Sequence, residues 1–241
     1  MSSVSAATEP EDAVESLRRE LCITMAAIHR RGWCEGTGGN FSCVIQRDPL
    51  QLLMAPSGVD KGTVRAAALI VVDAEGRVLQ GVGRVSAELA LHREIVRRCG
   101  AGAVLHTHSQ AATLLSRATL RRGGTAEQRG DRRRQEGGNR STTGRIHIEG
   151  LEMLKGLEGL QTHDCSIDIP VLANDQDLQR LSDEAGPHLG GAPHGILIAG
   201  HGLYAWGQDV QQARRHLEIL EFLLEQHWRE QLWNALSDAR P

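Results

Sequence analysis

Apolar residues recur at helical spacing in several stretches of the chain. Near the N-terminus, Leu17, Leu21, Met25 and Ile28 follow this spacing and predict an amphipathic helix that ends near Arg31. The same spacing predicts further helices over residues 86–100, 109–118, 148–160, 175–188 and 209–236. The helix over residues 175–188 should stop at its Gly-Pro pair, because proline lacks the backbone N–H that continues a helix.

Shorter apolar runs, each bounded by glycine, proline or aspartate, predict strands. They cover residues 41–45, 51–56, 68–73, 76–81, 101–109 and 165–173, and residues 195–207 should form a buried strand that leads into a glycine-flanked turn. The first four runs follow one another closely, which favours antiparallel pairing. The pattern therefore predicts one α/β domain over residues 1–241, with a mainly antiparallel sheet and helices outside it.

Residues 121–145 interrupt this pattern, because they are rich in arginine and glycine and contain no aliphatic side chain larger than alanine. Such a segment cannot contribute to a core, so we predict a mobile loop. The functional alternative is a basic lid over a phosphorylated substrate.

The charge balance excludes several classes of partner. The chain has 27 Lys and Arg against 30 Asp and Glu, a net charge of −3, so no basic field favours nucleic acid or an anionic membrane. No apolar run approaches the length of a transmembrane span, and the acidic N-terminus lacks the features of a signal peptide. The five cysteines include no Cys-x-x-Cys pair and are typical of reduced thiols. These features predict a cytoplasmic protein.

Two histidines, His106 and His108, stand at the end of the apolar run "GAVLHTHS". Alternation along a strand puts both imidazoles on one face, about 7 Å apart at the backbone, a spacing that can chelate one metal ion. His201 repeats the design, since it follows an Ile- and Leu-rich run where the chain turns. Three imidazoles would leave open positions on a divalent ion, as a catalytic site requires. The other histidines lie in helices or turns and are more typical of solvated or capping residues.

Two glycine-rich turns, "GTGGN" at residues 36–40 and "PSGVDKG" at residues 56–62, lie between predicted strands. Each can direct several backbone N–H groups at an anion, and Asn40, Ser57 and Lys61 can add side-chain donors. Glycine-rich hairpins without a ligand are common, and neither turn has the Gly-Lys-Ser/Thr of a Walker loop.

The segments "GTGGNFS", "APSGVDKG", "SAELALH", "GAVLHTHS" and "GHGLYAWG" occur in the order and at about the spacings of the class II aldolase/adducin family, which the chain resembles from Gly36 to Gly207. The resemblance implies a three-layer α/β sandwich, with a central mainly antiparallel sheet between helices, and a homotetramer with active sites at subunit boundaries. It also implies one zinc ion per subunit held by His106, His108 and His201. The implied phosphate pocket comprises Gly39, Asn40, Ser57, Gly58 and Ser86, and Lys61 of the second turn is a further candidate for phosphate binding.

Within that family, "HTHSQAATLLS", "GLEMLKGL" and "HGLYAWG" look most like a branch of dehydratases that act on a phosphorylated pentulose in methionine salvage. This resemblance implies a zinc-dependent lyase with a small sugar-phosphate substrate. Glu152 matches the acid/base of that branch, whereas Glu88 stands where the aldolases of the family carry a catalytic glutamate. The segment before Glu152 is longer than the family pattern, which puts the placement of that residue in question.

Two alternatives to this function remain open. One is a sugar-phosphate aldolase or a pentulose-phosphate 4-epimerase that uses the same zinc site, which Glu88 would favour. The other is a non-enzymatic interaction domain such as the adducin head, against which the three histidines argue.

Overall fold

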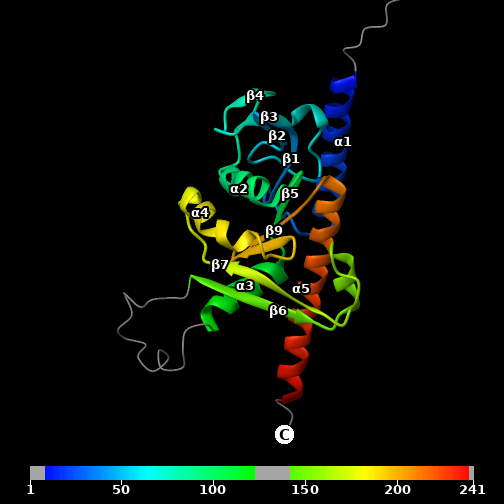
Figure 1. Cartoon of the computed structure of the whole chain (residues 1–241), viewed down its shortest axis with the longest axis vertical. Helices are drawn as coiled ribbons and strands as arrows, with labels where there is room; N and C mark the ends of the chain where they lie inside the picture. Colours follow the sequence, from blue (N-terminus) through cyan, green and yellow to red (C-terminus); the bar gives the residue numbers. More distant parts are fainter. Residues whose placement is uncertain (1–8, 123–141, 239–241) are drawn as a thin grey trace, which may run out of the picture.

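A sheet of nine strands forms the centre of the part of the chain that the computed structural model describes, residues 9–122 and 142–238. Its strand order is β4-β3-β2-β1-β5-β9-β8-β7-β6 (Figure 1). All neighbouring strands pair antiparallel except β7 and β8. The strands are β1 (Asn40–Arg47), β2 (Leu50–Met54), β3 (Ile70–Asp73), β4 (Val78–Gln80), β5 (Ala103–Thr107), β6 (Thr143–Glu149), β7 (Ser166–Leu172), β8 (Gly195–Ile198) and β9 (Gly202–Gly207).

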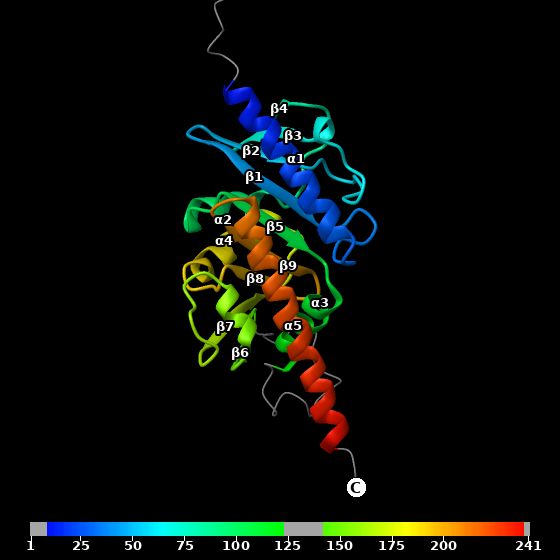
Figure 2. The same ribbon diagram turned by 90° about the vertical axis from the view of Figure 1, so that its right-hand side faces the viewer.

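Helices cover both faces of this sheet, which confirms the predicted fold class of a mainly antiparallel sheet flanked by helices. The helices α1 (Glu9–His29), α3 (Gln110–Arg122) and α5 (Val210–Asp238) pack on one face. The helices α2 (Leu89–Cys99) and α4 (Leu178–Leu189) pack on the other face and against each other. Figure 2 shows α5 crossing the sheet and extending beyond it toward the C-terminus. Two short 3₁₀ helices, η1 (Ala66–Ala68) and η3 (Glu152–Gly156), lie in connections.

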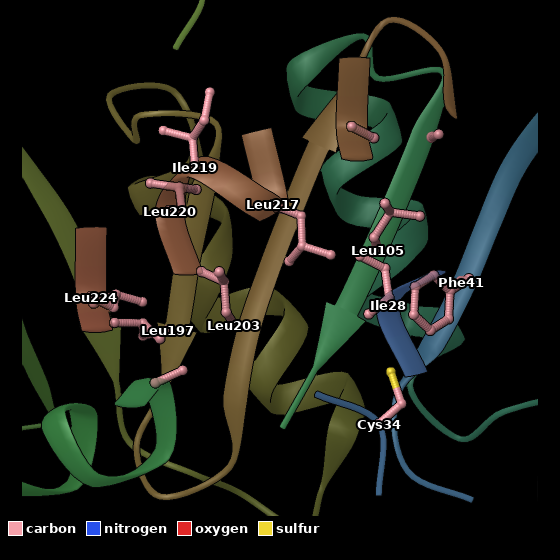
Figure 3. Close-up of a cluster of buried hydrophobic side chains, with 14 of the residues drawn as sticks. Ile28, Cys34, Phe41, Leu105, Leu197, Leu203, Leu217, Ile219, Leu220 and Leu224 are labelled. Atoms are coloured by element: carbon pink, nitrogen blue, oxygen red, sulfur yellow. The ribbon is translucent and has the colours of Figure 1, made fainter. Parts of the chain in front are cut away.

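The two faces have separate apolar clusters, because successive residues of a strand point to opposite sides. On the α5 face, Leu105 of β5 packs with Phe41 of β1 and Leu217 of α5 (Figure 3). On the other face, Val104 of β5 packs in the cluster that contains Leu91 of α2. This alternation places the side chain of His106 on the α2 and α4 face, and that of the intervening Thr107 on the α5 face.

The structure corrects the sequence-based prediction around residues 121–160. Strand β6 was missed, and the helix predicted over residues 148–160 is reduced to the single turn η3. The signal for β6 was present in "RIHIE", where Ile146 and Ile148 alternate with exposed residues and are themselves buried. Of the predicted loop, residues 121–122 end α3 and residues 143–145 begin β6, whereas residues 123–141 lie outside the described residues.

Two further boundaries differ from the prediction. Residues 195–207 form a hairpin of two strands, β8 and β9, rather than one strand and a turn, because both sides of the turn carry apolar residues that pair in register. Helix α4 continues past Gly186 and Pro187 and ends at Leu189. Pro187 has no backbone N–H, so the helix continues to Leu189 without the hydrogen bond from position 187 to the carbonyl oxygen of Asp183.

No helix among residues 9–122 and 142–238 is both long enough and apolar enough to cross a membrane.

Two isoleucines of α1 provide a test of how this helix contributes to the core. Ile28 is 0% exposed and Ile23 is 64% exposed. We expect Ile28→Ala to lower the free energy of unfolding by about 2–5 kcal/mol, because it leaves a cavity against the sheet. We expect Ile23→Ala to change it by less than about 0.5 kcal/mol. Urea denaturation of the two variants measures both values, and equal losses would contradict the packing of α1.

Candidate metal centre

Three histidines meet where strands β5 and β9 lie side by side. The register pairs His106 with Tyr204 and Thr107 with Leu203 at the end of the β5 ladder. His108 follows β5 directly, and His201 lies in the turn between β8 and β9. Gly202 allows this approach, since a Cβ at that position would lie 1.9 Å from the carbonyl oxygen of Thr107. The backbone therefore brings together two histidine segments separated by more than 90 residues.

The Nε2 atoms of the three rings converge on one point. His106 Nε2 lies 2.8 Å from His108 Nε2 and 3.3 Å from His201 Nε2. The carboxylate of Glu88 completes the group, and its oxygens lie 2.9 Å from His201 Nε2 and 3.6 Å from His106 Nε2. One potential ligand atom from each of the four residues lies within 4.8 Å of all the others.

This donor set fits a divalent metal ion such as zinc. Zinc–nitrogen bonds of 2.0–2.1 Å in a tetrahedral site hold their nitrogen ligands about 3.3 Å apart, close to the separations found here. His106 Nδ1 donates to the carbonyl oxygen of Leu203 at 2.9 Å, which leaves the lone pair on Nε2 facing its neighbours. Burial lowers the pKa values of His106 and His108, which keeps both rings neutral, as ligands must be.

Glu88 precedes the first residue of α2 and is ionised at neutral pH. Burial disfavours its charge, but His106, His201 and the side-chain amide of Asn40 outweigh burial and hold its pKa well below the usual range. The Asn40 amide Nδ2 donates to Oε2 of Glu88. The centre therefore combines neutral nitrogen donors with one carboxylate that can bind a cation or accept a proton.

A cavity of about 580 Å³ opens beside this centre, and all six residues predicted for phosphate binding line it together with Glu88, His108 and His201. The six are Gly39, Asn40, Ser57, Gly58, Lys61 and Ser86. Several of them have partners within the chain that the sequence did not indicate, among them Asn40 and Lys61. Asn40 donates to Glu88, and Lys61 Nζ donates to the carbonyl oxygens of Thr37 and Val59 at 2.9 and 3.0 Å.

Glu152 lies outside the cavity of its own chain. It begins η3, where its carboxylate pairs with Lys155 and lies 3.6 Å from His163. Strand β6 starts beside the end of β7 and runs away from the histidines for about 20 Å over its seven residues before η3 begins. The side chain of Glu152 is 68% exposed.

Three features of the centre and its surroundings were not found from the sequence. Tyr204 is fully buried and stacks on His106, with ring centroids 3.9 Å apart. Arg84 donates to Ser57 Oγ at 3.1 Å and adds a cation to the second glycine turn. Glu221 of α5 is buried on the other face of β5, where it accepts hydrogen bonds from Thr107 and Ser109. Its sequence signal was a charged residue within the apolar stripe of a helix.

A second group of potential ligands, Glu158, His194 and His216, does not converge in the same way. The rings of His194 and His216 are stacked 4.1 Å apart, so their lone pairs do not point at one ion. His216 also uses both nitrogens, since Nδ1 donates to the carbonyl oxygen of Trp206 and Nε2 accepts from the backbone N–H of Glu158. These residues hold loops together rather than form a metal site.

Comparison with known proteins relates most of the chain to one family. Residues 19–228 match the family model described as "Class II Aldolase and Adducin N-terminal domain". A methylthioribulose-1-phosphate dehydratase of Acidiphilium cryptum is 37% identical over 93% of this chain and 95% of that protein. The enzyme of that name from Granulibacter bethesdensis is 41% identical over 80% of this chain and 82% of that protein.

Solved structures share the fold. The L-fuculose-1-phosphate aldolase of Thermus thermophilus superposes with a TM-score of 0.68 at 22% identity, over 92% of this chain and 98% of that one. YgbL of Escherichia coli, a putative aldolase/epimerase/decarboxylase by its title, gives a TM-score of 0.66 at 23% identity, over 88% of each chain.

Removal of one imidazole tests the centre as a metal site. We expect the purified protein to hold about one zinc ion per chain and His201→Ala to bind zinc at least about tenfold more weakly, because a tetrahedral site loses one of its ligands. Metal analysis after dialysis measures the content. His147→Ala is the matched control, since His147 is an exposed histidine on β6. Equal zinc content in the protein and both variants would contradict the assignment.

Proposed function

The chain belongs to the class II aldolase and adducin family, and we propose that it is a lyase, a zinc-dependent methylthioribulose-1-phosphate dehydratase. The reaction removes water from 5-methylthioribulose 1-phosphate to give 5-methylthio-2,3-dioxopentyl phosphate. The observation that carries the proposal is the match to relatives with this name at 37% and 41% identity, over 93% and 80% of this chain. The convergence of three histidines and Glu88 beside a glycine-lined cavity supports it.

We assign zinc to His106, His108 and His201, one ion per chain. Bound there, the metal would polarise the substrate's carbonyl and adjacent hydroxyl oxygens and stabilise the negative charge that develops when the C3 proton leaves. Burial lowers the pKa values of His106 and His108 and keeps these two rings neutral, and the hydrogen bond from Nδ1 to Leu203 orients the Nε2 atom of His106. The product requires loss of the C3 proton and of the C4 hydroxyl group, so a carboxylate must accept one proton and return one to the leaving oxygen.

The glycine turns bind the phosphate group in this proposal. Ser57, Gly58 and Ser86 line the cavity near the exposed Arg84, and Lys61 supplies a buried positive charge behind both turns. These groups hold the far end of the substrate and contribute binding energy rather than chemistry. Asn40 has a second role, since its amide holds Glu88 beside the histidines.

We propose that Glu152 is the principal acid/base and that it acts on the site of a neighbouring copy. Its exposure and its distance from the histidines of its own chain support this arrangement. The hydrogen bond from Lys155 lowers the pKa of Glu152, which keeps it ionised and able to accept a proton. The arrangement agrees with a homotetramer whose sites lie between subunits, and we extend the proposal to that assembly. We further propose a cytoplasmic location, for which the five free cysteines are typical.

The second candidate is a sugar-phosphate aldolase or 4-epimerase, and the position of Glu88 favours it. Glu88 touches the histidine cluster within its own chain, as expected of a carboxylate that serves an aldolase directly. An adducin-like interaction domain is the remaining alternative and would have no use for the converging imidazoles.

Substrate turnover separates these functions. We expect the zinc-loaded protein to convert methylthioribulose 1-phosphate into the diketone phosphate, measured by the absorbance of the product or by mass spectrometry. The matched comparison is fuculose 1-phosphate, from which an aldolase releases an aldehyde. Aldehyde release without diketone formation would overturn the dehydratase proposal, and turnover of neither substrate would favour the interaction domain.

A mixture of two inactive variants tests whether Glu152 acts between copies. We expect Glu152→Gln to retain zinc and lose at least ~100-fold in kcat, on the scale of a lost general acid/base. Co-expression of Glu152→Gln with His201→Ala should recover activity, up to about a quarter of the sites at random mixing in a ring of identical interfaces. Each restored site combines His201 from one chain with Glu152 from the next.

The control for this mixture is His106→Ala with His201→Ala, in which the zinc ligands cannot be supplied by another copy. It should stay inactive. Near-normal activity of Glu152→Gln would move the acid/base role to Glu88, and loss without recovery in the mixture would place Glu152 in the site of its own chain.

A further inference from the structure

Glu221 occupies a position on the apolar face of α5, where the helical spacing predicts an apolar residue. It lies between Leu217, Leu220 and Leu224, which pack on the sheet (Figure 3), and is itself 2% exposed. In the described part of the chain no lysine or arginine pairs with it. A buried carboxylate without a cation is costly, and burial raises its pKa to about 7 against the opposing hydrogen bonds of Ser109 and Thr107. Because a buried carboxylate lowers the stability of the fold, packing does not explain why a glutamate occupies this position.

The two carboxylate oxygens of Glu221 accept hydrogen bonds from the end of β5, next to His106 and His108. Thr107 Oγ1 donates to Oε1 at 2.6 Å, and Ser109 Oγ donates to Oε2. Thr107 and Ser109 alternate with His106 and His108 along the chain. The hydroxyls point toward Glu221 of α5, whereas the Nε2 atoms of the two imidazoles lie together in the histidine cluster, where His108 lines the cavity.

His108 has fewer other contacts than His106 to fix its orientation. His106 has three other supports, which are its place in the β5–β9 ladder, the bond from Nδ1 to Leu203, and the stacked ring of Tyr204. His108 lies beyond the last paired residue of β5, and its backbone N–H donates to the carbonyl oxygen of Trp33 at 2.8 Å. Within the described residues, no protein group forms a hydrogen bond with its Nδ1.

Ser109 also connects Glu221 to the start of α3. Its hydroxyl also accepts the backbone N–H of Ala112 at 3.1 Å, at the start of α3. Glu221 therefore ties three elements to one point, namely the end of β5, the first turn of α3 and the middle of α5. It does not line the cavity beside the histidines, so it has no access to a substrate there.

We propose that Glu221 is a positioning residue for the metal centre, holding Thr107 and Ser109 from behind so that His106 and His108 present their Nε2 atoms to the ion. The proposal rests on the metal centre assigned above and concerns the orientation of the ligands rather than the chemistry. Partners of this kind typically change metal affinity about 10- to 100-fold when they are removed.

Zinc affinity, measured by competition with a chromophoric chelator, tests the proposal without any substrate. We expect Glu221→Gln to bind zinc about 10- to 100-fold more weakly, because an amide replaces one acceptor oxygen with a donor. Glu225→Gln is the matched control. Glu225 lies one turn later on α5, is more exposed than Glu221, and pairs with Arg229. The control should bind zinc like the unmodified protein.

If Glu221→Gln fails to fold, substitutions of its two hydrogen-bond donors test the proposal instead. Ser109→Ala and Thr107→Val each remove one hydroxyl and should each weaken zinc binding. Thr107→Ser keeps the hydroxyl and should restore the affinity. The effects of Glu221→Gln and Ser109→Ala should be less than additive in the double variant, because both remove the same hydrogen bond.

Unfolding of the metal-free variants distinguishes positioning from a purely structural role. Unchanged zinc affinity in Glu221→Gln, Ser109→Ala and Thr107→Val, with lower stability of the metal-free proteins, would overturn the proposal. Failure of the unmodified protein to bind zinc would overturn the metal centre itself, and the positioning role with it.

Discussion

The pairing of β5 with β9 is the constraint on which the site depends. The two strands are neighbours at the centre of the sheet, and their register sets His106 opposite Tyr204. Glycine at position 202 lets the start of β9 lie against the carbonyl oxygen of Thr107, where any side chain would collide. The turn that holds His201 is thereby brought against the end of β5. A shift of one residue in this register would send the imidazole of His106 into the apolar cluster under α5.

Two effects set the protonation states at the metal centre. One is the burial of His106, and the other is the set of polar groups that face Glu88. The sheet and α2 exclude water from His106, which disfavours its charged form. Glu88 stays ionised in the same environment because the Asn40 amide and the imidazoles face it. Imidazole nitrogens and one carboxylate are a donor set that suits a divalent transition-metal ion such as zinc.

The strand-end histidines and the glycine turns could be predicted from the sequence because their signals are local. An apolar run with histidines two residues apart already specifies which side chains share a face. Interactions between distant elements left no such signal. The amide of Asn40 was expected to bind phosphate, yet it contacts Glu88, and nothing in either segment indicates that β1 and the start of α2 adjoin. The position of Glu152 was unpredictable because it depends on the direction of β6, a strand whose short alternation follows a long polar segment.

Lys61 has a consequence for the entropy of binding. The residue is 2% exposed, and its ammonium group bridges the carbonyl oxygens of Thr37 and Val59, one from each glycine turn. Loops rich in glycine lose much conformational freedom when they become ordered, and a ligand that orders them bears that cost as weaker affinity. Here the lysine joins the two turns within the chain itself. In the phosphate site proposed above, an anion would meet turns that are already held together, and its binding would lose little free energy to loop ordering.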